Sequence, residues 1–272
     1  MQETDKRAQR ALIITLDGAR PDALAIADTP VIDNLWQQGA YTWQAQTVEP
    51  SVTLPTHCSL FYGTTPDEHG VQSNSWPDPY VQPIPSLLEL CHNHGMSTAA
   101  VCGWPPFATL VPSGIVDYTD LTHEYEKDAI ATGHGAVEII RNHAPGAMFL
   151  YLAQPDTDGH AFGWMSDEYI RAIELCDQAT GMALQAVAAN GDLEQTVIAV
   201  LADHGGHEHK HGTDMPEDMT IPWILSGAGV CRGVEVSTPV VIQDTAPTLA
   251  AVLGLPIPEQ WSGRVVEEVR CG

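Results

Sequence analysis

Three short apolar segments of the sequence each run into an aspartate at or just past their C-terminal end. Asp17 follows ALIITL (11–16), Asp156 follows MFLYLA (148–153) after Gln-Pro, and Asp203 follows TVIAVLA (196–202). Apolar segments of this length are typical of strands that are buried on both faces. In open parallel sheets, ligands bind beyond the carboxyl ends of the strands. Three carboxylates at that edge predict a cation site, whereas one isolated aspartate more often caps a helix or a turn.

Histidines accompany two of these aspartates. His160 follows Asp156 by four residues, so a loop or one helical turn can bring both side chains to one ion, and His204 directly follows Asp203. Imidazole nitrogen and carboxylate oxygen suit zinc, although such sites also accept manganese or iron. The segment GGHEHKHGT then offers three more histidines, His207, His209 and His211. A histidine-rich surface loop that binds metal adventitiously is the alternative, and it stays open for the first two of these three.

Thr53 is the candidate nucleophile. It stands just ahead of an expected helix that begins with Leu54-Pro55-Thr56, where a hydroxyl lies near the positive end of the helix dipole. A bound zinc ion would lower the pKa of that hydroxyl further. The alternative is that Thr53 is only a helix cap. Cys58 is a rival nucleophile, but its apolar helical setting indicates a core residue. The same interpretation, core or loop, applies to His57 and His69.

The elements that must position these residues alternate along the chain. Two more apolar segments, TAAVC (98–102) and IPWILS (221–226), complete five expected strands. Helical periodicity lies between the strands over 85–94, 124–143 and 166–190, and a last helix is expected from near Asp244 to Gly254. This alternation predicts one α/β domain over 1–272, with a mostly parallel central sheet and helices on both faces. Residues 1–10 are expected to form a flexible tail, and residues 64–84 a long loop.

The amino-acid composition limits the classes of binding partner that are expected. Asp and Glu number 35 against 11 Lys and Arg, for a formal net charge of −24. Such a surface repels nucleic acid and anionic membranes, so neither is expected as a partner. The apolar N-terminal segment is too short for a signal peptide or a membrane span. The six cysteines form no CxxC pair, and a chain of 272 residues needs no disulfide framework. We therefore expect a cytoplasmic protein with reduced thiols; the oligomeric state is not predicted.

Five segments together resemble the alkaline phosphatase superfamily, and within it the nucleotide pyrophosphatase/phosphodiesterase branch. They are LDGARPD, TLPTHCSLFYGTTPDEHG, PDTDGHAFG, ADHGGHEHKHGT and QDTAPTLAAVLG, in this order over residues 11–254. The resemblance implies an alkaline phosphatase-like α/β fold, and the chain is short enough that only a minimal cap is expected. It also implies two zinc ions and a transiently phosphorylated threonine.

The resemblance assigns roles to particular residues. One zinc ion would be surrounded by Asp17, Thr53, Asp203 and His204, and the other by Asp156, His160 and His211. His211 is chosen within its loop because HGT followed by TIPWI is similar to the last histidine of the family before a strand. Asn74, in GVQSN, would hold a phosphoryl oxygen.

The implied function is hydrolysis of a small phosphate ester through a phospho-threonine intermediate. Phosphodiesters are expected to be preferred over monoesters, because no phosphate-binding arginine or third-metal carboxylate is found and Arg20 is expected on the surface. Trp76, Trp104 and Phe107 could stack on a base or aryl ring, or could equally be core residues. A phosphonate hydrolase or a phosphomonoesterase on the same bimetal site stays open, as does an inactive metal-binding protein. The sequence has no CxPxR motif, which argues against a formylglycine sulfatase.

Overall fold

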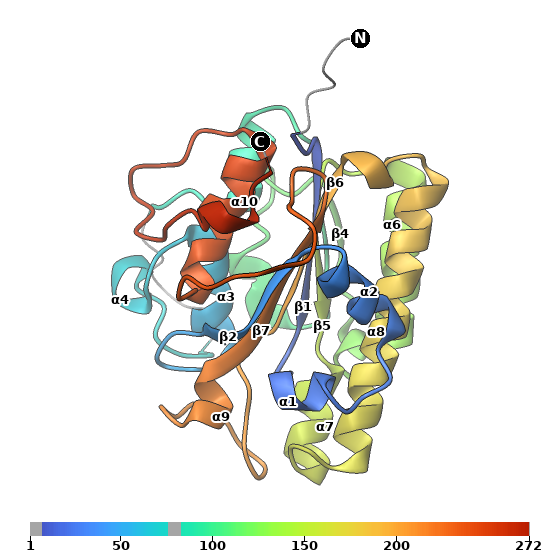
Figure 1. Ribbon diagram of the computed structural model, residues 1–272, viewed down its shortest axis with the longest axis vertical. Helices are drawn as coiled ribbons and strands as arrows, with labels where there is room; N and C mark the ends of the chain where they lie inside the picture. The colour runs from blue at the N-terminus through green and yellow to red at the C-terminus, as the bar shows by residue number, and fades with distance from the viewer. Residues whose placement is uncertain (1–6, 76–82, 272) are drawn as a thin grey trace.

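The computed structural model describes residues 7–75 and 83–271 and is built around one mixed sheet (Figure 1). Its strand order is β4-β3-β5-β1-β6-β7-β2-β8. Among the strands described, only β7 runs against its neighbours, since it pairs antiparallel with both β6 and β2. The strands are β1 (Arg10–Leu16), β2 (Ala40–Gln46), β3 (Thr98–Val101), β4 (Tyr118–Asp120), β5 (Ala147–Leu152), β6 (Thr196–Leu201), β7 (Thr220–Gly227) and β8 (Val234–Glu235). The predicted mostly parallel sheet is confirmed.

Helices cover both faces of this sheet, which explains why its central strands are apolar throughout (Figure 1). One face carries α2 (Pro30–Gln37), α6 (Ala129–His143), α7 (Gln154–Phe162) and α8 (Asp167–Ala189), with α8 in contact with the other three. The other face carries α3 (Thr53–Tyr62), α5 (Leu87–Asn93) and α10 (Thr245–Leu253), which pack around α3. Every residue of β5 and β6 is buried as a result.

Short helical segments connect these elements. In the described part of the chain, three are single α-helical turns: α1 (Pro21–Leu24), α4 (Pro66–His69) and α9 (Pro216–Met219). Five more in the same residues are 3-10 turns: η1 (Pro105–Thr109), η2 (His123–Lys127), η3 (Leu193–Gln195), η4 (Ile242–Asp244) and η5 (Glu267–Val269). Near the lower edge of the sheet in Figure 1, α1 and α7 lie next to the carboxyl ends of the central strands.

The predicted elements agree with this fold where they are long and apolar. The five expected strands are β1, β3, β5, β6 and β7, and the expected helices correspond to α5, to η2 with α6, to α8 and to α10. Gly254 ends α10 in the left-handed conformation, with φ of 70°. The sequence did not predict β2, β4, β8, α2 or the full length of α7. The expected 64–84 loop contains α4, and its residues 76–82 lie outside the described part of the chain.

The predicted tail over 1–10 overlaps ordered chain at its C-terminal end. Ala8 is buried, and its backbone N–H donates to the carbonyl of Val252 at 3.3 Å. The Gln9 N–H donates to the carbonyl of Gln195, and Arg10 begins β1. Residues 7–10 therefore belong to the packed fold.

The expectation of reduced thiols is wrong for two of the six cysteines. Cys231 and Cys271 form a disulfide, with their Cα atoms 4.9 Å apart, that ties the C-terminal segment to the turn after β7. They are 40 residues apart in the sequence, so no local spacing of cysteines predicted this disulfide. The other four take no part in a disulfide and are buried: Cys58, Cys91, Cys102 and Cys176. The cytoplasmic location remains a prediction.

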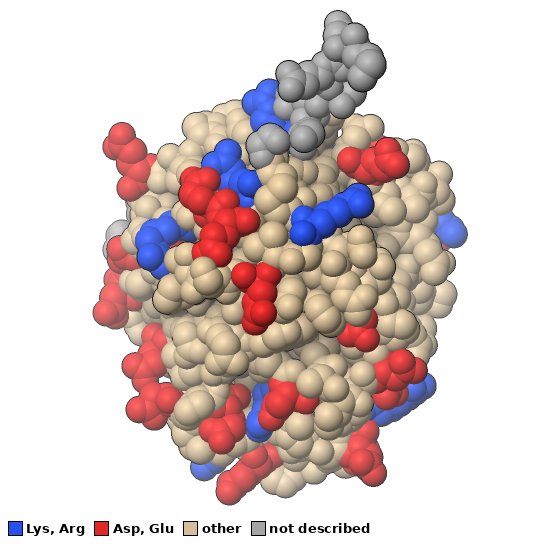
Figure 2. Space-filling view, viewed as in Figure 1, with Lys and Arg blue, Asp and Glu red and all other residues tan. Residues whose placement is uncertain are grey.

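The acidic side chains do not gather into one patch on the face drawn in Figure 2. On the face drawn in Figure 2, the red Asp and Glu side chains are scattered, and several lie beside blue Lys or Arg. Within the described residues, no helix is both long enough and apolar enough to cross a membrane.

Candidate metal centre

The three aspartates that end apolar segments lie at one edge of the sheet. β1 pairs in parallel with β5 on one side and with β6 on the other, so the three strands end together. Asp17 directly follows β1, Asp203 lies just beyond β6, and Asp156 lies in the first turn of α7 beyond β5. Asp17 and Asp203 are fully buried, and the Asp156 side chain is 18% exposed. The fold therefore brings the three carboxylates together at the edge of the sheet where the sequence predicted them.

A first group of donor atoms surrounds the space between Asp17 and Asp203. The Oδ1 atom of Asp17 lies 3.3 Å from Nε2 of His204 and has no hydrogen-bond partner. The Oδ2 atom of Asp17 accepts a hydrogen bond from the Tyr151 hydroxyl. Asp203 accepts from the backbone N–H of Gly18 at 3.1 Å through Oδ1, and its Oδ2 lies 3.3 Å from the same His204 nitrogen. The two carboxylates therefore converge on one imidazole.

Thr53 joins this first group. Its hydroxyl oxygen lies 3.4 Å from Nε2 of His204. It is the first residue of α3, and the residue that caps the helix is Val52, whose side chain makes no capping hydrogen bond. The helix thus begins one residue earlier than expected, and Thr53 does not serve as its cap. The next backbone N–H, that of Leu54, donates to Oδ1 of Asn74 at 2.8 Å, which brings this exposed asparagine beside the start of α3.

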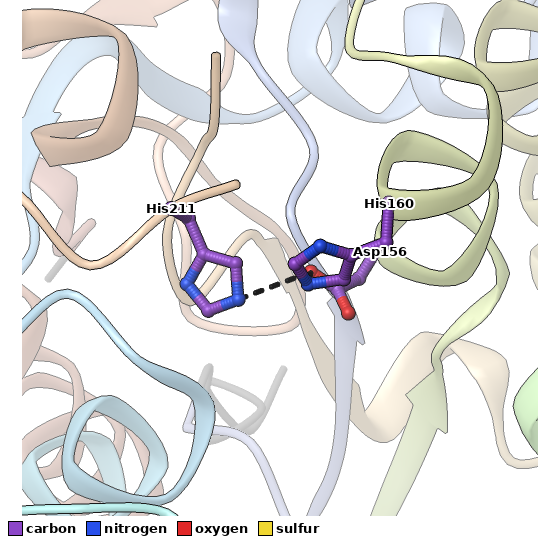
Figure 3. A group of neighbouring side chains, drawn as sticks. All are labelled: Asp156, His160 and His211. Carbon is purple, nitrogen blue, oxygen red and sulfur yellow. Dashed lines mark ion pairs between the residues drawn. The ribbon is translucent and has the colours of Figure 1, made fainter. Parts of the chain in front are cut away.

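A second group consists of Asp156, His160 and His211 (Figure 3). Nε2 of His160 and Nε2 of His211 each lie 3.5 Å from Oδ1 of Asp156, and this oxygen has no hydrogen-bond partner. Asp156 and His160 are one turn apart on α7, which is the second of the two arrangements, loop or helical turn, that their spacing allowed, and His211 comes from the loop after β6. Figure 3 shows the His211 ring directed toward the carboxylate, on the side opposite α7, which carries His160. Asp17, Asp156 and His204 also bring donor atoms within 4.8 Å of one another, so the two groups adjoin.

The outer nitrogen of each imidazole contacts a backbone carbonyl. Nδ1 of His204 lies 2.8 Å from the oxygen of Gly205, Nδ1 of His160 lies 2.9 Å from that of His209, and Nδ1 of His211 lies 2.9 Å from that of Ser51. Because a carbonyl oxygen can only accept, we assign the proton of each neutral ring to Nδ1. Each Nε2 then presents a lone pair to the carboxylates, as a metal-binding histidine does.

Acceptor atoms thus face acceptor atoms in both groups. Lone pairs of three imidazoles point at carboxylate oxygens, and two of these oxygens, Oδ1 of Asp17 and Oδ1 of Asp156, are buried without a donor. Buried oxygens of this kind are destabilising unless a proton or a cation lies beside them. Neutral imidazoles with carboxylates are also the donor set that suits zinc and related divalent ions. The residues present therefore fit a divalent metal centre.

The electrostatics of the cluster point the same way. Burial, followed by the charges of Asp203 and Asp156, raises the pKa of Asp17 well above its ordinary value, and burial and Asp203 do the same for the pKa of Asp156. Burial also opposes the ionisation of Asp203, but His204 and then His57 hold the pKa of this carboxyl well below its usual range. Burial lowers the pKa of His204, and it lowers that of His211 to about 3. Neutral rings are therefore available at neutral pH, and a cation would displace the carboxyl protons.

The remaining histidines of the loop after β6 have other partners. Nδ1 of His207 lies 2.7 Å from Oδ1 of Asp218, a fully buried carboxylate that also accepts from the Thr213 N–H and hydroxyl. His209 is exposed, and its Nδ1 lies 3.2 Å from the carbonyl oxygen of His160. Neither side chain is among the grouped donor atoms. Asp218 closes the loop that presents His211, a role that nothing in the local sequence indicated.

Several other expectations can be compared with the structure. Arg20 was expected on the surface, but its side chain is only 16% exposed, pairs with Asp22 and donates to the carbonyl of Gly206. Phe107 is a core residue, since it is fully buried against Tyr151. Trp104 is half-buried against Phe107, and Trp76 lies outside the described residues. Cys58, His57 and His69 are buried as expected.

Sequence reasoning missed two residues that touch the cluster. Tyr151, the donor to Asp17, was interpreted only as part of an apolar strand. His57 was interpreted as a core or loop residue, yet its Nδ1 lies 3.4 Å from Oδ2 of Asp203. Its position four residues after Thr53 was the available signal, because residues spaced by four share one face of a helix.

Comparison with curated proteins finds relatives whose names are those of enzymes that cleave phosphate esters. Mouse ectonucleotide pyrophosphatase/phosphodiesterase family member 1 is 25% identical over 214 residues, which is 71% of this chain and 24% of that protein. Venom phosphodiesterase 2 of Crotalus adamanteus is 25% identical over 224 residues, 72% of this chain and 27% of that protein. The chain spans about a quarter of the length of these relatives.

Solved structures share the fold at low identity. Murine ectonucleotide pyrophosphatase/phosphodiesterase 5, as an inactive threonine-to-alanine variant in complex with AMP, superposes with a TM-score of 0.79 at 15% identity, covering 92% of this chain and 96% of that one. A putative sulfatase from Bacteroides thetaiotaomicron gives a TM-score of 0.80 at 16% identity, covering 97% and 75%. The expected alkaline phosphatase-like fold is confirmed, and at these identities the likeness extends to the fold alone.

A family model distinguishes the phosphodiesterases from the sulfatases among these similar proteins. The model described as type I phosphodiesterase/nucleotide pyrophosphatase matches residues 11–220, well over half of the chain. That span contains the three strand-end aspartates, Thr53 and the histidines of both donor groups. The resemblance found in the sequence is confirmed: the chain belongs to the type I phosphodiesterase/nucleotide pyrophosphatase family.

Proposed function

We propose that the protein is a metal-dependent hydrolase of small phosphate esters, with phosphodiesters preferred and Thr53 as the nucleophile. The observation that carries the proposal is the inward-facing set of unpartnered acceptors beside the Thr53 hydroxyl. Asp17, Asp203 and His204 would hold one divalent cation together with Thr53, and Asp156, His160 and His211 would hold a second. Zinc fits this donor set best, and manganese or iron are the other candidates.

The reaction would proceed through a phosphorylated threonine. Bound divalent cations would lower the pKa of the Thr53 hydroxyl and offset the charge that develops on the phosphate oxygens. The Oγ1 atom of Thr53, having lost its proton to solvent, would form a bond to phosphorus as the bond to the first leaving group breaks. Water would then attack the same phosphorus, the bond to Oγ1 would break, and the hydroxyl of Thr53 would be restored as the phosphate monoester leaves.

Two further features suit this reaction. Thr53 is the first residue of α3, so a phosphate bound beside its hydroxyl would lie near the positive end of this helix, which favours negative charge. Asn74 bonds to the Leu54 N–H, so its side chain is close enough to Thr53 to contact a non-bridging phosphoryl oxygen. The AMP in the related inactive variant supports a nucleotide-like substrate for this chain as well.

The preference for diesters rests on charge. A monoester dianion carries more negative charge than a diester and needs an additional cation near its terminal oxygens. Arg20, the basic residue nearest to Asp17 in the sequence, is already paired with Asp22 and bonded to the Gly206 carbonyl. A diester monoanion requires no such partner.

The test compares two chromogenic substrates on protein purified without chelator. We expect about two equivalents of zinc per chain, and a kcat/KM for bis(p-nitrophenyl) phosphate above that for p-nitrophenyl phosphate. A ratio well below one would replace the diesterase with a monoesterase. Faster hydrolysis of a p-nitrophenyl phosphonate than of either would favour the phosphonate hydrolase. Metal-loaded protein that cleaves none of them would support the inactive metal-binding alternative.

A further inference from the structure

His57 connects the start of α3 to the carboxylate cluster. Its side chain is fully buried. Its Nδ1 lies 2.8 Å from the carbonyl oxygen of Thr53 and 3.4 Å from Oδ2 of Asp203, while its Nε2 lies 3.0 Å from the hydroxyl of Thr15 in β1. One ring therefore contacts the backbone of the proposed nucleophile, a carboxylate of the cluster and the central strand.

These contacts assign the tautomer of the ring. The carbonyl oxygen of Thr53 can only accept, so Nδ1 of His57 carries the proton and donates it toward that oxygen and the nearby carboxylate. Nε2 is then the acceptor for the hydroxyl of Thr15. The hydroxyl of Thr56 reaches the same carbonyl at 2.9 Å and the same carboxylate oxygen at 3.3 Å, so two side chains span this junction.

Aromatic side chains restrict the orientation of the His57 ring. The ring centroids of Phe107, Tyr151 and Phe149 lie 4.7, 5.4 and 5.8 Å from its own, and none of the three rings is parallel to it. Close packing of this kind leaves few rotamers open to a buried side chain. The Nδ1–H is thus held in a fixed direction.

We infer that His57 is a positioning residue, whose Nδ1–H fixes the first turn of α3 relative to Asp203 and so sets the place of Thr53 in the site. The inference rests on the proposed function, in which Thr53 and Asp203 share one cation. A displaced nucleophile lowers the rate of the chemical step more than it weakens substrate binding, because proximity acts on the transition state. It also loosens a ligand pair, which lowers metal affinity.

Two substitutions of His57 separate positioning from packing. In His57→Asn the amide nitrogen lies near the place of Nδ1 and can still donate toward Thr53 and Asp203. In His57→Gln the amide lies near the place of Nε2, so the Thr15 contact is kept and the Thr53 contact is lost. We expect His57→Gln to lower kcat about 10- to 100-fold with a smaller change in KM, and His57→Asn to stay within a few-fold of the wild type.

His69 provides the matched control. It is equally buried, its Nε2 lies 3.0 Å from the Ser59 hydroxyl, and its Nδ1 accepts from the Val71 N–H at 3.1 Å. These bonds join α3 to the segment after α4. We expect His69→Asn and His69→Gln to lower Tm to an extent comparable to the His57 variants, while kcat stays near that of the wild type.

Zinc affinity, measured by competition with a chromogenic chelator, gives a second readout that needs no turnover. We expect His57→Gln to weaken zinc binding at the site that Asp203 and Thr53 share about 10- to 100-fold, and His57→Asn to weaken it less. If the wild type binds zinc but hydrolyses no ester, the proposed function fails while the affinity ranking still decides the role of His57. Equal effects of His57→Asn and His57→Gln on kcat and zinc affinity, or losses in the His69 pair as large as those in the His57 pair, would overturn the inference.

Discussion

Substitution of Thr53 by alanine should remove activity at little cost in stability. Thr53 lies inside α3 and Val52 occupies the capping position, so no helix cap is lost. The hydroxyl has one long contact, 3.4 Å to His204, worth at most about 1 kcal/mol. Loss of the buried methyl group costs ~0.8 kcal/mol, and the higher helix propensity of alanine returns roughly half of that. The net destabilisation is about 1 kcal/mol, or a fall in Tm of roughly 2–4 °C.

The activity should fall far more. Without an oxygen to attack phosphorus, kcat for bis(p-nitrophenyl) phosphate should drop by roughly 10³-fold or more, as it does when other enzymes lose their nucleophile. Thr53→Ser keeps the hydroxyl and should retain much of the rate. Cys58→Ala, which alters a buried thiol on the same helix, should lower Tm and leave kcat largely unchanged. Thr53→Ala with activity within tenfold of the wild type, and Cys58→Ala without activity, would refute the assignment of the nucleophile.

Three further outcomes are expected. His211→Ala should weaken zinc binding strongly and His209→Ala only slightly, as measured by calorimetry, and the opposite order would mean that the wrong histidine of the loop was chosen. Because the pKa values of Asp17 and Asp156 are raised in the folded state, the metal-free protein should lose stability as pH rises above about 4, the value of an unfolded carboxyl. The lowered pKa values of His204 and His211 act oppositely, since their contribution is lost as pH falls below about 6.5. The rise in Tm on adding zinc should therefore be larger at pH 8 than at pH 5, and a rise that shrinks with pH would contradict the proton displacement. Gly206→Ala should lower Tm by several degrees, because the added Cβ would lie 2.2 Å from the Trp164 ring, and an unchanged Tm would show that the ring moves aside freely.

The sequence predicted the buried centre of the sheet because short uninterrupted apolar segments are typical of strands that are covered on both faces. β5 and β6 are buried at every position, and their patterns were unambiguous. β2 was missed because its sequence AYTWQAQ is neither apolar throughout nor regularly alternating, and only Ala40, Thr42 and Ala45 of the strand are buried. The full length of α7 was missed because QPDTDGHAF has no apolar stripe; Asp156 and His160 on this helix belong to the donor group instead of the core.

The same distinction applies to the candidate site. The sequence allowed us to predict that the carboxylates and histidines lie together, because neighbouring parallel strands end at the same edge of the sheet. The residues that orient them could not. Tyr151 lies within an apolar strand and His57 within an apolar helix, and both have the sequence context of ordinary core residues. Their polar atoms gain a role only when β1 and β5, or α3 and β6, come together, which is a property of the tertiary structure.

The parallel order β5-β1-β6 also bears on how the chain folds. Gly18 and Asp203, which share a hydrogen bond in the centre, are 185 residues apart, and Asp17 and its donor Tyr151 are 134 residues apart. Contacts of such range form late and slowly, because long loops must close first. A cation added during refolding should therefore find its ligands only after the three strands have paired, and should slow unfolding more than it speeds refolding. During synthesis, the centre cannot be complete before the loop that carries His211 has left the ribosome.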